Sequence, residues 1–122
     1  DVCSSDLKIG KNAFNGCKKL TKAIIGANVT QIGDEAFANC TTLKSVILPA
    51  KVTKLGKKAF KGDKKLKTIT IRSTKLTSKS VSIDAFNGVD KKTVIKVPKA
   101  KKKAYTKLFR KKGLSKKVKI KS

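Results

Sequence analysis

Residues 32–54, IGDEAFANCTTLKSVILPAKVTK, form a unit of 23 residues that recurs along this chain of 122 residues. The dipeptide Ala-Phe stands at 13–14, 36–37, 59–60 and 85–86, so successive copies are 23, 23 and 26 residues apart. An aliphatic residue precedes each Ala by four positions, and a glycine follows it in the first three copies. Self-similarity at such a period is typical of proteins built by stacking repeats.

Each unit also contains a short segment in which apolar and polar residues alternate, which indicates a half-buried strand. Residues nine and eleven positions after each Phe are apolar: Ala23 and Ile25, Val46 and Leu48, Ile69 and Ile71, Ile95 and Val97. One unit has nothing to cover its apolar side, whereas stacked units bury one another. The strands should therefore stack in parallel around an internal ladder of Phe14, Phe37, Phe60 and Phe86.

These features predict a β-rich α/β solenoid of about four 23-residue units with parallel short strands. We expect a short helical turn around Asp34–Ala38 and at the equivalent places, followed by a C-terminal helix plus strand cap. The boundaries we predict are a non-native or irregular lead-in at 1–8, a repeat solenoid at 9–98 and a basic helical cap at 99–122. In the cap, Ala100, Ala104 and Leu108 form one apolar stripe of a helix, and Val118 and Ile120 alternate as in a strand.

The pattern I-G-x-x-A-F-x-x-C-x-x-L resembles the 23-residue bacterial surface-antigen type of leucine-rich repeat, the BspA-like class, from about Lys8 to Pro98. Asp63 and Val89 depart from it in the Cys slot, and Lys92 in the Leu slot. The resemblance implies a C-terminal fragment of an exported, non-enzymatic adhesion protein, secreted or at the cell surface, with a signal peptide upstream. Residues 1–7, DVCSSDL, look like a translated sequencing adapter, in which case Cys3 is not native; the alternative is a native irregular lead-in.

The composition argues against an enzyme and against a metal or cofactor site. The chain has no His, Met or Trp and only seven acidic residues, so the usual general bases and nucleophile pairings are missing. Cys17 and Cys40 occupy one slot of adjacent units, where stacking permits a disulfide. Free buried thiols are favoured there, because equivalent side chains of parallel strands point the same way, and the bonded state stays open.

Thirty-two Lys and Arg residues against seven acids give a net charge of +25, most of it in the second half of the chain. The tail from Lys99 to Ser122 has 12 cations and no acid. This end is predicted to contact a polyanion through Lys101, Lys102, Lys103, Lys107, Arg110, Lys111 and Lys112. An ordinary solvated helix face is the alternative.

Outward strand positions are the predicted contact surface for a partner, and Ile24 beside Ile47 would form a small apolar patch. The set is Lys22, Ile24, Ser45, Ile47, Thr68, Thr70, Val94 and Lys96.

The expected partner is a host or bacterial surface protein, or an anionic wall polymer or glycan, bound by a monomer. The alternative function is nonspecific binding of nucleic acid or another polyanion. Sequence-specific nucleic-acid binding is not expected, because 30 of the 32 cations are Lys and aromatic residues are few. No apolar run is long enough to span a bilayer.

Overall fold

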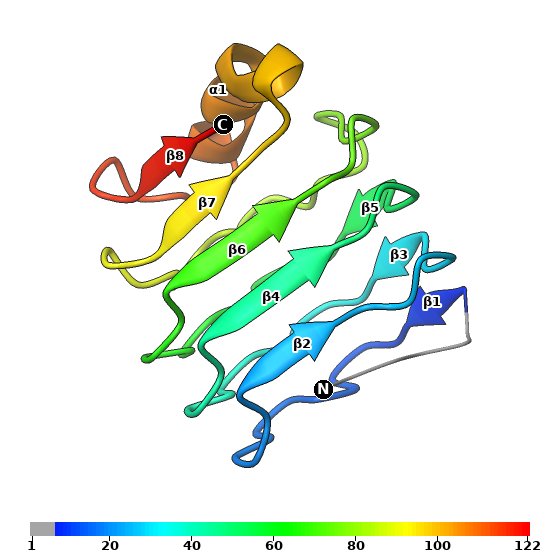
Figure 1. Cartoon of the computed structure of the whole chain (residues 1–122), viewed down its shortest axis with the longest axis vertical. Helices are drawn as coiled ribbons and strands as arrows, with labels where there is room; N and C mark the ends of the chain where they lie inside the picture. Colours follow the sequence, from blue (N-terminus) through cyan, green and yellow to red (C-terminus); the bar gives the residue numbers. More distant parts are fainter. Residues whose placement is uncertain (1–6) are drawn as a thin grey trace.

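The computed structural model describes residues 7–122, which form a stack of repeats, or rungs, with one sheet on each of two sides (Figure 1). The large sheet has the order β2-β4-β6-β7-β8 and the small sheet β1-β3-β5, and every pair is parallel. The strands are β1 Lys8–Ile9, β2 Lys22–Ile24, β3 Gln31–Ile32, β4 Ser45–Leu48, β5 Lys54–Leu55, β6 Thr68–Ile71, β7 Val94–Lys96 and β8 Lys119–Lys121. The helical segments of the described chain are η1, Lys99–Lys101, and α1, Lys102–Lys111. Predictions about residues 1–6, including Cys3, lie outside the described residues.

The predicted alternation decides which face of the large sheet is buried. In β4 and β6 the pattern is half-buried, buried, half-buried, buried, so Val46, Leu48, Ile69 and Ile71 enter the core. Val46 pairs with Ile69, and Ile69 with Ile95, so equivalent residues of successive units lie side by side. A slip of one residue would turn this apolar set outward, which is why the period fixes the register.

The helical turns predicted around Asp34–Ala38 and at the equivalent places are wrong, because these segments are series of tight turns. Glu35, Lys58 and Asp84, each two residues before the Phe, have φ of 53°, 52° and 64°. A right-handed helix cannot pass through residues in the left-handed region. The backbone is paired between rungs instead: the Phe14 N–H donates to Ala36 O (2.8 Å) and the Phe37 N–H to Ala59 O (3.0 Å).

The aromatic side chains form the inner column of the core. Phe37 stacks on Phe14 and on Phe60 with ring centroids 5.3 and 6.0 Å apart. Phe86 is also fully buried, and its ring lies 4.4 Å from that of Phe109. The predicted ladder is thus found as two groups of rings, Phe14–Phe37–Phe60 and Phe86–Phe109–Tyr105, and the second group extends into the C-terminal segment.

The C-terminal segment contains the predicted helix and strand and continues the same core. Phe109 lies 23 residues after Phe86, on the inner face of α1, and is fully buried. Beside it on α1, the Tyr105 hydroxyl donates to Ser73 O (2.7 Å) and accepts from the Leu76 N–H (3.2 Å). Strand β8 then pairs with β7, placing Ile120 next to Ile95. Residues 99–122 are thus integrated with the repeats through both the core and the sheet.

A column of glycines allows the close approach of rungs beside the small sheet. A Cβ added at Gly56 would lie 2.4 Å from the Gly33 carbonyl carbon, and one at Gly33 would lie 2.6 Å from that of Gly10. Real Cβ atoms are not found so close to backbone, so only glycine fits here. At Gly10 itself, an added Cβ would meet no heavy atom of residues 7–122 within 4 Å.

We therefore expect Gly56→Ala to lower the free energy of unfolding by about 1–3 kcal/mol, the usual cost of overpacking. Gly10→Ala is the matched control, with the same chemical change in an open place, and should stay within about 0.5 kcal/mol of the parent. Urea unfolding followed by far-ultraviolet circular dichroism measures both. Equal effects of the two variants would contradict the close approach.

Candidate functional site

The outer face of the large sheet is made of two rows of side chains that run across the rungs. The strand pairing places Lys22, Ser45, Thr68, Val94 and Lys119 in one row, and Ile24, Ile47, Thr70, Lys96 and Lys121 in the other. All the partner-contact residues predicted from sequence lie in these rows. Lys119 and Lys121 extend them and were missed, although the alternation of Val118 and Ile120 could have indicated them.

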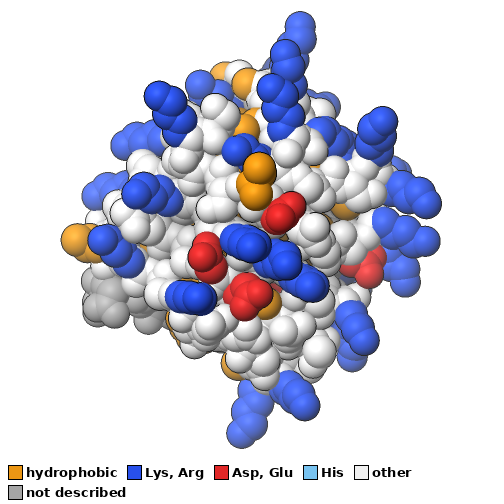
Figure 2. Space-filling model, turned by 180° about the vertical axis from the view of Figure 1, so that it is seen from behind, with side chains coloured by type: hydrophobic (Ala, Val, Ile, Leu, Met, Phe, Trp, Pro, Cys, Tyr) orange, Lys and Arg blue, Asp and Glu red, His pale blue; other side chains and the backbone are white. Residues whose placement is uncertain are grey.

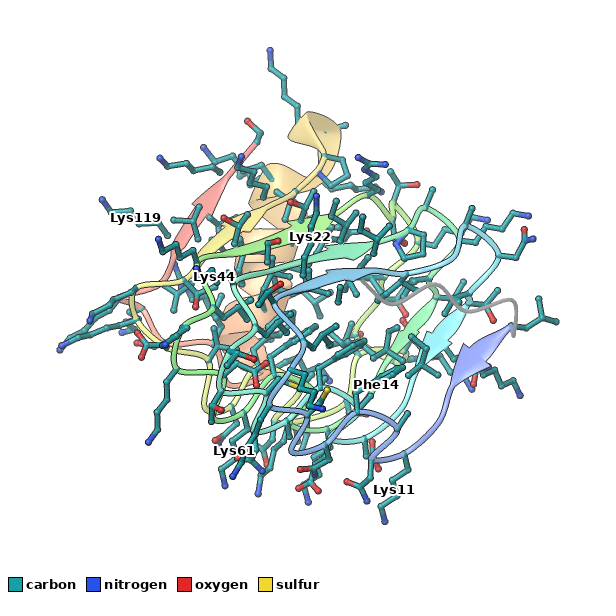
Figure 3. The ribbon with its side chains drawn as sticks, turned by 60° about the horizontal axis from the view of Figure 1, so that its bottom comes forward. Lys11, Phe14, Lys22, Lys44, Lys61 and Lys119 are labelled. Atoms are coloured by element: carbon teal, nitrogen blue, oxygen red, sulfur yellow. The ribbon has the colours of Figure 1, made fainter. Side chains whose placement is uncertain are left out.

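The chemistry of these rows changes along the stack. Ile24 is 42% exposed, and Ile47 beside it is half-buried, so the two form the predicted apolar patch on β2 and β4. Hydroxyls of β4 and β6 adjoin the patch, and lysines stand toward β7 and β8. Figure 3 shows Lys22 and Lys119 at the large sheet, with Lys11 and Lys61 on the opposite side of the molecule. The face offers apolar, hydroxyl and cationic groups, a mixture that suits a protein surface.

The seven predicted polyanion-contact residues lie on η1, on α1 and just after it, in two different situations. Lys102, Lys103, Lys107 and Lys111 are exposed, and Lys101 is half-exposed. Arg110 instead donates to the carbonyls of Ser115 and Val118 (2.9 Å for the second), and Lys112 Nζ donates to Ser78 O (2.8 Å). These last two side chains therefore brace the loops around α1, whereas the lysines named first extend into solvent.

Cys40 and Asp63 form the most perturbed ionisable pair in the described chain, and they lie in the interior. The Cys40 N–H donates to Asp63 Oδ1 (2.8 Å), while Asp63 Oδ2 is buried without a hydrogen-bond partner. Burial raises the pKa of the Asp63 carboxyl to about 8. Burial, with the Asp63 charge as a second cause, raises the pKa of the Cys40 thiol to about 12. A thiol that stays protonated is not a nucleophile at neutral pH.

Cys17 and Cys40 are free thiols, in agreement with the favoured interpretation. Cys17 is half-buried, and the Cys40 Sγ lies 3.2 Å from the carbonyl oxygen of Phe14. Within residues 7–122, no three His, Cys, Asp or Glu side chains gather as metal ligands would. Figure 2 shows the back of the molecule, where acidic side chains lie at the centre among lysines and further lysines stand around the rim.

Comparison with known proteins identifies the repeat class. The family model described as "BspA type Leucine rich repeat region" matches residues 7–122 in six copies. No curated protein matches the chain significantly. Among solved structures, the chain is similar to that described as "The Crystal structure of Pneumococcal vaccine antigen PcpA", with 19% identity and a TM-score of 0.46. The similarity covers 95% of this chain and 41% of that one, so this chain spans about two fifths of its length.

No helix in the described part of the chain has the length and apolar character needed to cross a bilayer. The family match includes residues 99–122 together with the four units recognised in the sequence. It agrees with the parallel, in-register pairing of both sheets and with the 23-residue spacing of the core phenylalanines. The chain belongs to the BspA type leucine-rich repeat family.

Proposed function

We propose that this chain is a non-enzymatic interaction module of an exported bacterial protein, secreted or at the cell surface, which binds its partner through the outer face of the large sheet. The family supports this proposal, because its repeat fold is generally used for protein interaction. The observation that carries it is the pair Ile24 and Ile47, an apolar patch on a face whose other outward side chains are polar or charged except Val94. Apolar patches with polar borders mark contact sites.

The exposed lysines of η1 and α1 form a second contact surface in this proposal, for a polyanionic partner or for the acidic part of a protein. Lys103, Lys107 and Lys111 follow one another at spacings of four residues, so they share one face of α1. Arg110 and Lys112 hold backbone carbonyls and do not belong to this surface. Contacts of this kind are salt-dependent, since exposed charges are screened over about 8 Å at physiological ionic strength.

The test uses the double variant Ile24→Asp with Ile47→Asp. We expect at least about a tenfold loss of affinity for a partner captured from extracellular-matrix extract, because each carboxylate would be desolvated within the contact. Affinity is measured by surface plasmon resonance on the purified partner after quantitative mass spectrometry of the capture.

The matched control is the double variant Leu7→Asp with Ile83→Asp. These two large apolar side chains of the described residues are 62% and 70% exposed, and neither belongs to a strand of the large sheet. The control should bind as the parent does. The sheet-face proposal is wrong if the Ile24 and Ile47 variant keeps the parent affinity while its circular dichroism spectrum is unchanged.

A further inference from the structure

Lysine pairs recur at the place where the chain enters the strands of the large sheet. They precede β2, β6, β7 and β8 by two to four residues, and single lysines directly precede β4 and β6. We call this set the basic edge: Lys18, Lys19, Lys44, Lys64, Lys65, Lys67, Lys91, Lys92, Lys116 and Lys117. All ten side chains are exposed. None of them belongs to the sheet face or to the α1 surface described above.

Backbone pairing aligns the basic edge along the stack. The Lys44 N–H donates to Thr21 O, the Lys67 N–H to Lys44 O and the Val94 N–H to Lys67 O, each at 2.8 Å. Lys44 and Lys67 are therefore neighbours on adjacent rungs, about 4.8 Å apart at the backbone. Figure 3 shows Lys44 on the same side as Lys22 and Lys119. A line of ammonium groups thus runs across the rungs rather than along one strand.

A hollow lies at the middle of this edge, where a buried column ends. Leu20, Leu43 and Leu66 fill one slot of successive units and are buried, whereas Lys92 stands in that slot on the next rung and is exposed. The hollow beside Leu66 has a volume of about 390 Å³ and is otherwise lined by lysines: Lys44, Lys64, Lys65, Lys67 and Lys92. The hollow lies at the rung where Lys92 replaces the leucine of the repeat.

No carboxylate lines this hollow. Asp63, next to Lys64, is 2% exposed and binds the Cys40 N–H. Asp90 accepts the backbone N–H of Lys92 (2.8 Å). Five lysines around one hollow concentrate positive charge there, so the hollow is suited to a multiply charged oxyanion.

We propose that the basic edge binds an anionic polysaccharide laid along the stack, with a sulfate or phosphate ester seated in the hollow. Lysine suits this ligand because it acts as a point charge and does not need the paired geometry of an arginine fork. The hydroxyls of Ser45 and Thr68 directly follow Lys44 and Lys67 on the outer face, within reach of sugar hydroxyls. Aromatic residues, on which nucleic-acid bases stack, are absent from the lining. The inference rests on the proposed function only in treating the chain as a binding module.

The experiment compares two variants of the full chain that lose the same charge. One carries Lys64→Gln, Lys65→Gln, Lys67→Gln and Lys92→Gln at the hollow. The control carries Lys11→Gln, Lys54→Gln, Lys57→Gln and Lys61→Gln, none of which belongs to the basic edge, the sheet face or the α1 surface. All eight side chains are exposed, so both variants are expected to fold, which circular dichroism and thermal unfolding check. Isothermal calorimetry uses a highly sulfated heparin-type glycan, the same glycan after desulfation, a phosphorylated mannan and duplex DNA.

We expect the hollow variant to lose roughly tenfold or more in affinity for a sulfated or phosphorylated glycan, and the control variant to lose less than about threefold. The more tightly bound of the two glycans identifies which ester is preferred. The proposal would be overturned by equal losses of affinity in the two variants. It would also be overturned if the desulfated glycan bound as tightly as the sulfated one and the phosphorylated glycan did not bind, or if duplex DNA bound more tightly than the glycans. The Ile24→Asp with Ile47→Asp variant should keep its glycan affinity, which separates this result from failure of the sheet-face proposal.

Discussion

The free energy of unfolding is expected to fall as the pH rises from about 4 to about 8, and Asp63→Asn is expected to remove most of this dependence. Asp63 is 2% exposed, and its Oδ2 has no hydrogen-bond partner, so the fold accommodates the protonated carboxyl better than the carboxylate. The asparagine keeps an oxygen that can accept the Cys40 N–H, as Oδ1 does now.

The sign follows from the two states of the chain. Burial raises the pKa of Asp63 from 3.8 to about 8 in the folded state. The stabilisation is therefore complete below the unfolded pKa and is lost as the pH rises through the folded pKa. Each unit of difference between the folded and unfolded pKa corresponds to about 1.4 kcal/mol, so the whole loss of unfolding free energy is on the order of 5 kcal/mol. The facing Cys40 thiol stays protonated throughout this range, since its pKa is raised to about 12.

Urea unfolding at a series of pH values from 4 to 9 measures this effect. Asp90→Asn is the matched control, because Asp90 also accepts a backbone N–H but is less buried. Its curve should follow the parent, while that of Asp63→Asn should be nearly flat. The prediction is contradicted if the free energy of unfolding of the parent stays constant or increases between pH 4 and pH 8 and Asp63→Asn gives the same curve. Asp63 would then ionise without destabilising the fold.

Phe109→Ala is expected to lower the free energy of unfolding of the whole chain by about 3–5 kcal/mol, the usual cost of removing a buried aromatic ring. Phe109 is fully buried and lies 4.4 Å from Phe86 and 5.2 Å from Tyr105, between centroids. Its removal would leave a cavity between the last Ala-Phe unit and α1. The large effect follows because the C-terminal segment shares one core with the repeats.

Chemical unfolding followed both by circular dichroism and by Tyr105 fluorescence tests this prediction. Coincident transitions, both shifted by Phe109→Ala, are expected of one cooperative unit. Lys107→Ala, an exposed position on the same helix, should change stability by no more than about 0.5 kcal/mol. A Phe109→Ala variant in which the Tyr105 signal alone shifts would mean that α1 unfolds separately from the repeats.

The strands and their register could be predicted because each inward residue is covered by the equivalent residues of the neighbouring repeats. Val46 and Ile69 alternate with polar residues at a constant distance from their Phe, and only one register buries both. The outward set containing Ile24 and Ile47 follows from the same alternation. For these positions, local pattern and tertiary packing give the same answer.

The tight turns could not be predicted in the same way. Asp34–Ala38 is compatible with helix as a local sequence, and Glu35 is a residue that ordinarily avoids positive φ. What selects the turns is pairing between rungs, such as the Glu35 N–H with Lys57 O (2.8 Å), which no single unit contains. Phe109 does not stand out as a fifth repeat position because Leu-Phe replaces the Ala-Phe dipeptide there.

The hollow of the basic edge depends on a departure from the repeat. In the sequence, Lys92 is only a departure from the Leu slot of the repeat. The structure shows that it lines a hollow beside Leu66 together with four other lysines. The recurring Lys-Lys pairs are a signal that the sequence already contains, because they lie two to four residues before four of the five strands of the large sheet.

The direction of the hydrogen bonds has a mechanical consequence. The bonds between rungs, in both sheets and in the turns, point along the stack, which runs from the N-terminal to the C-terminal end in Figure 1. Tension applied to the two ends therefore loads the bonds along their own axes, and they give way a few at a time rather than all together in shear. Each released unit of 23 residues adds up to about 75–80 Å of chain. Under a pull, the molecule would lengthen in steps, dissipating the load rung by rung.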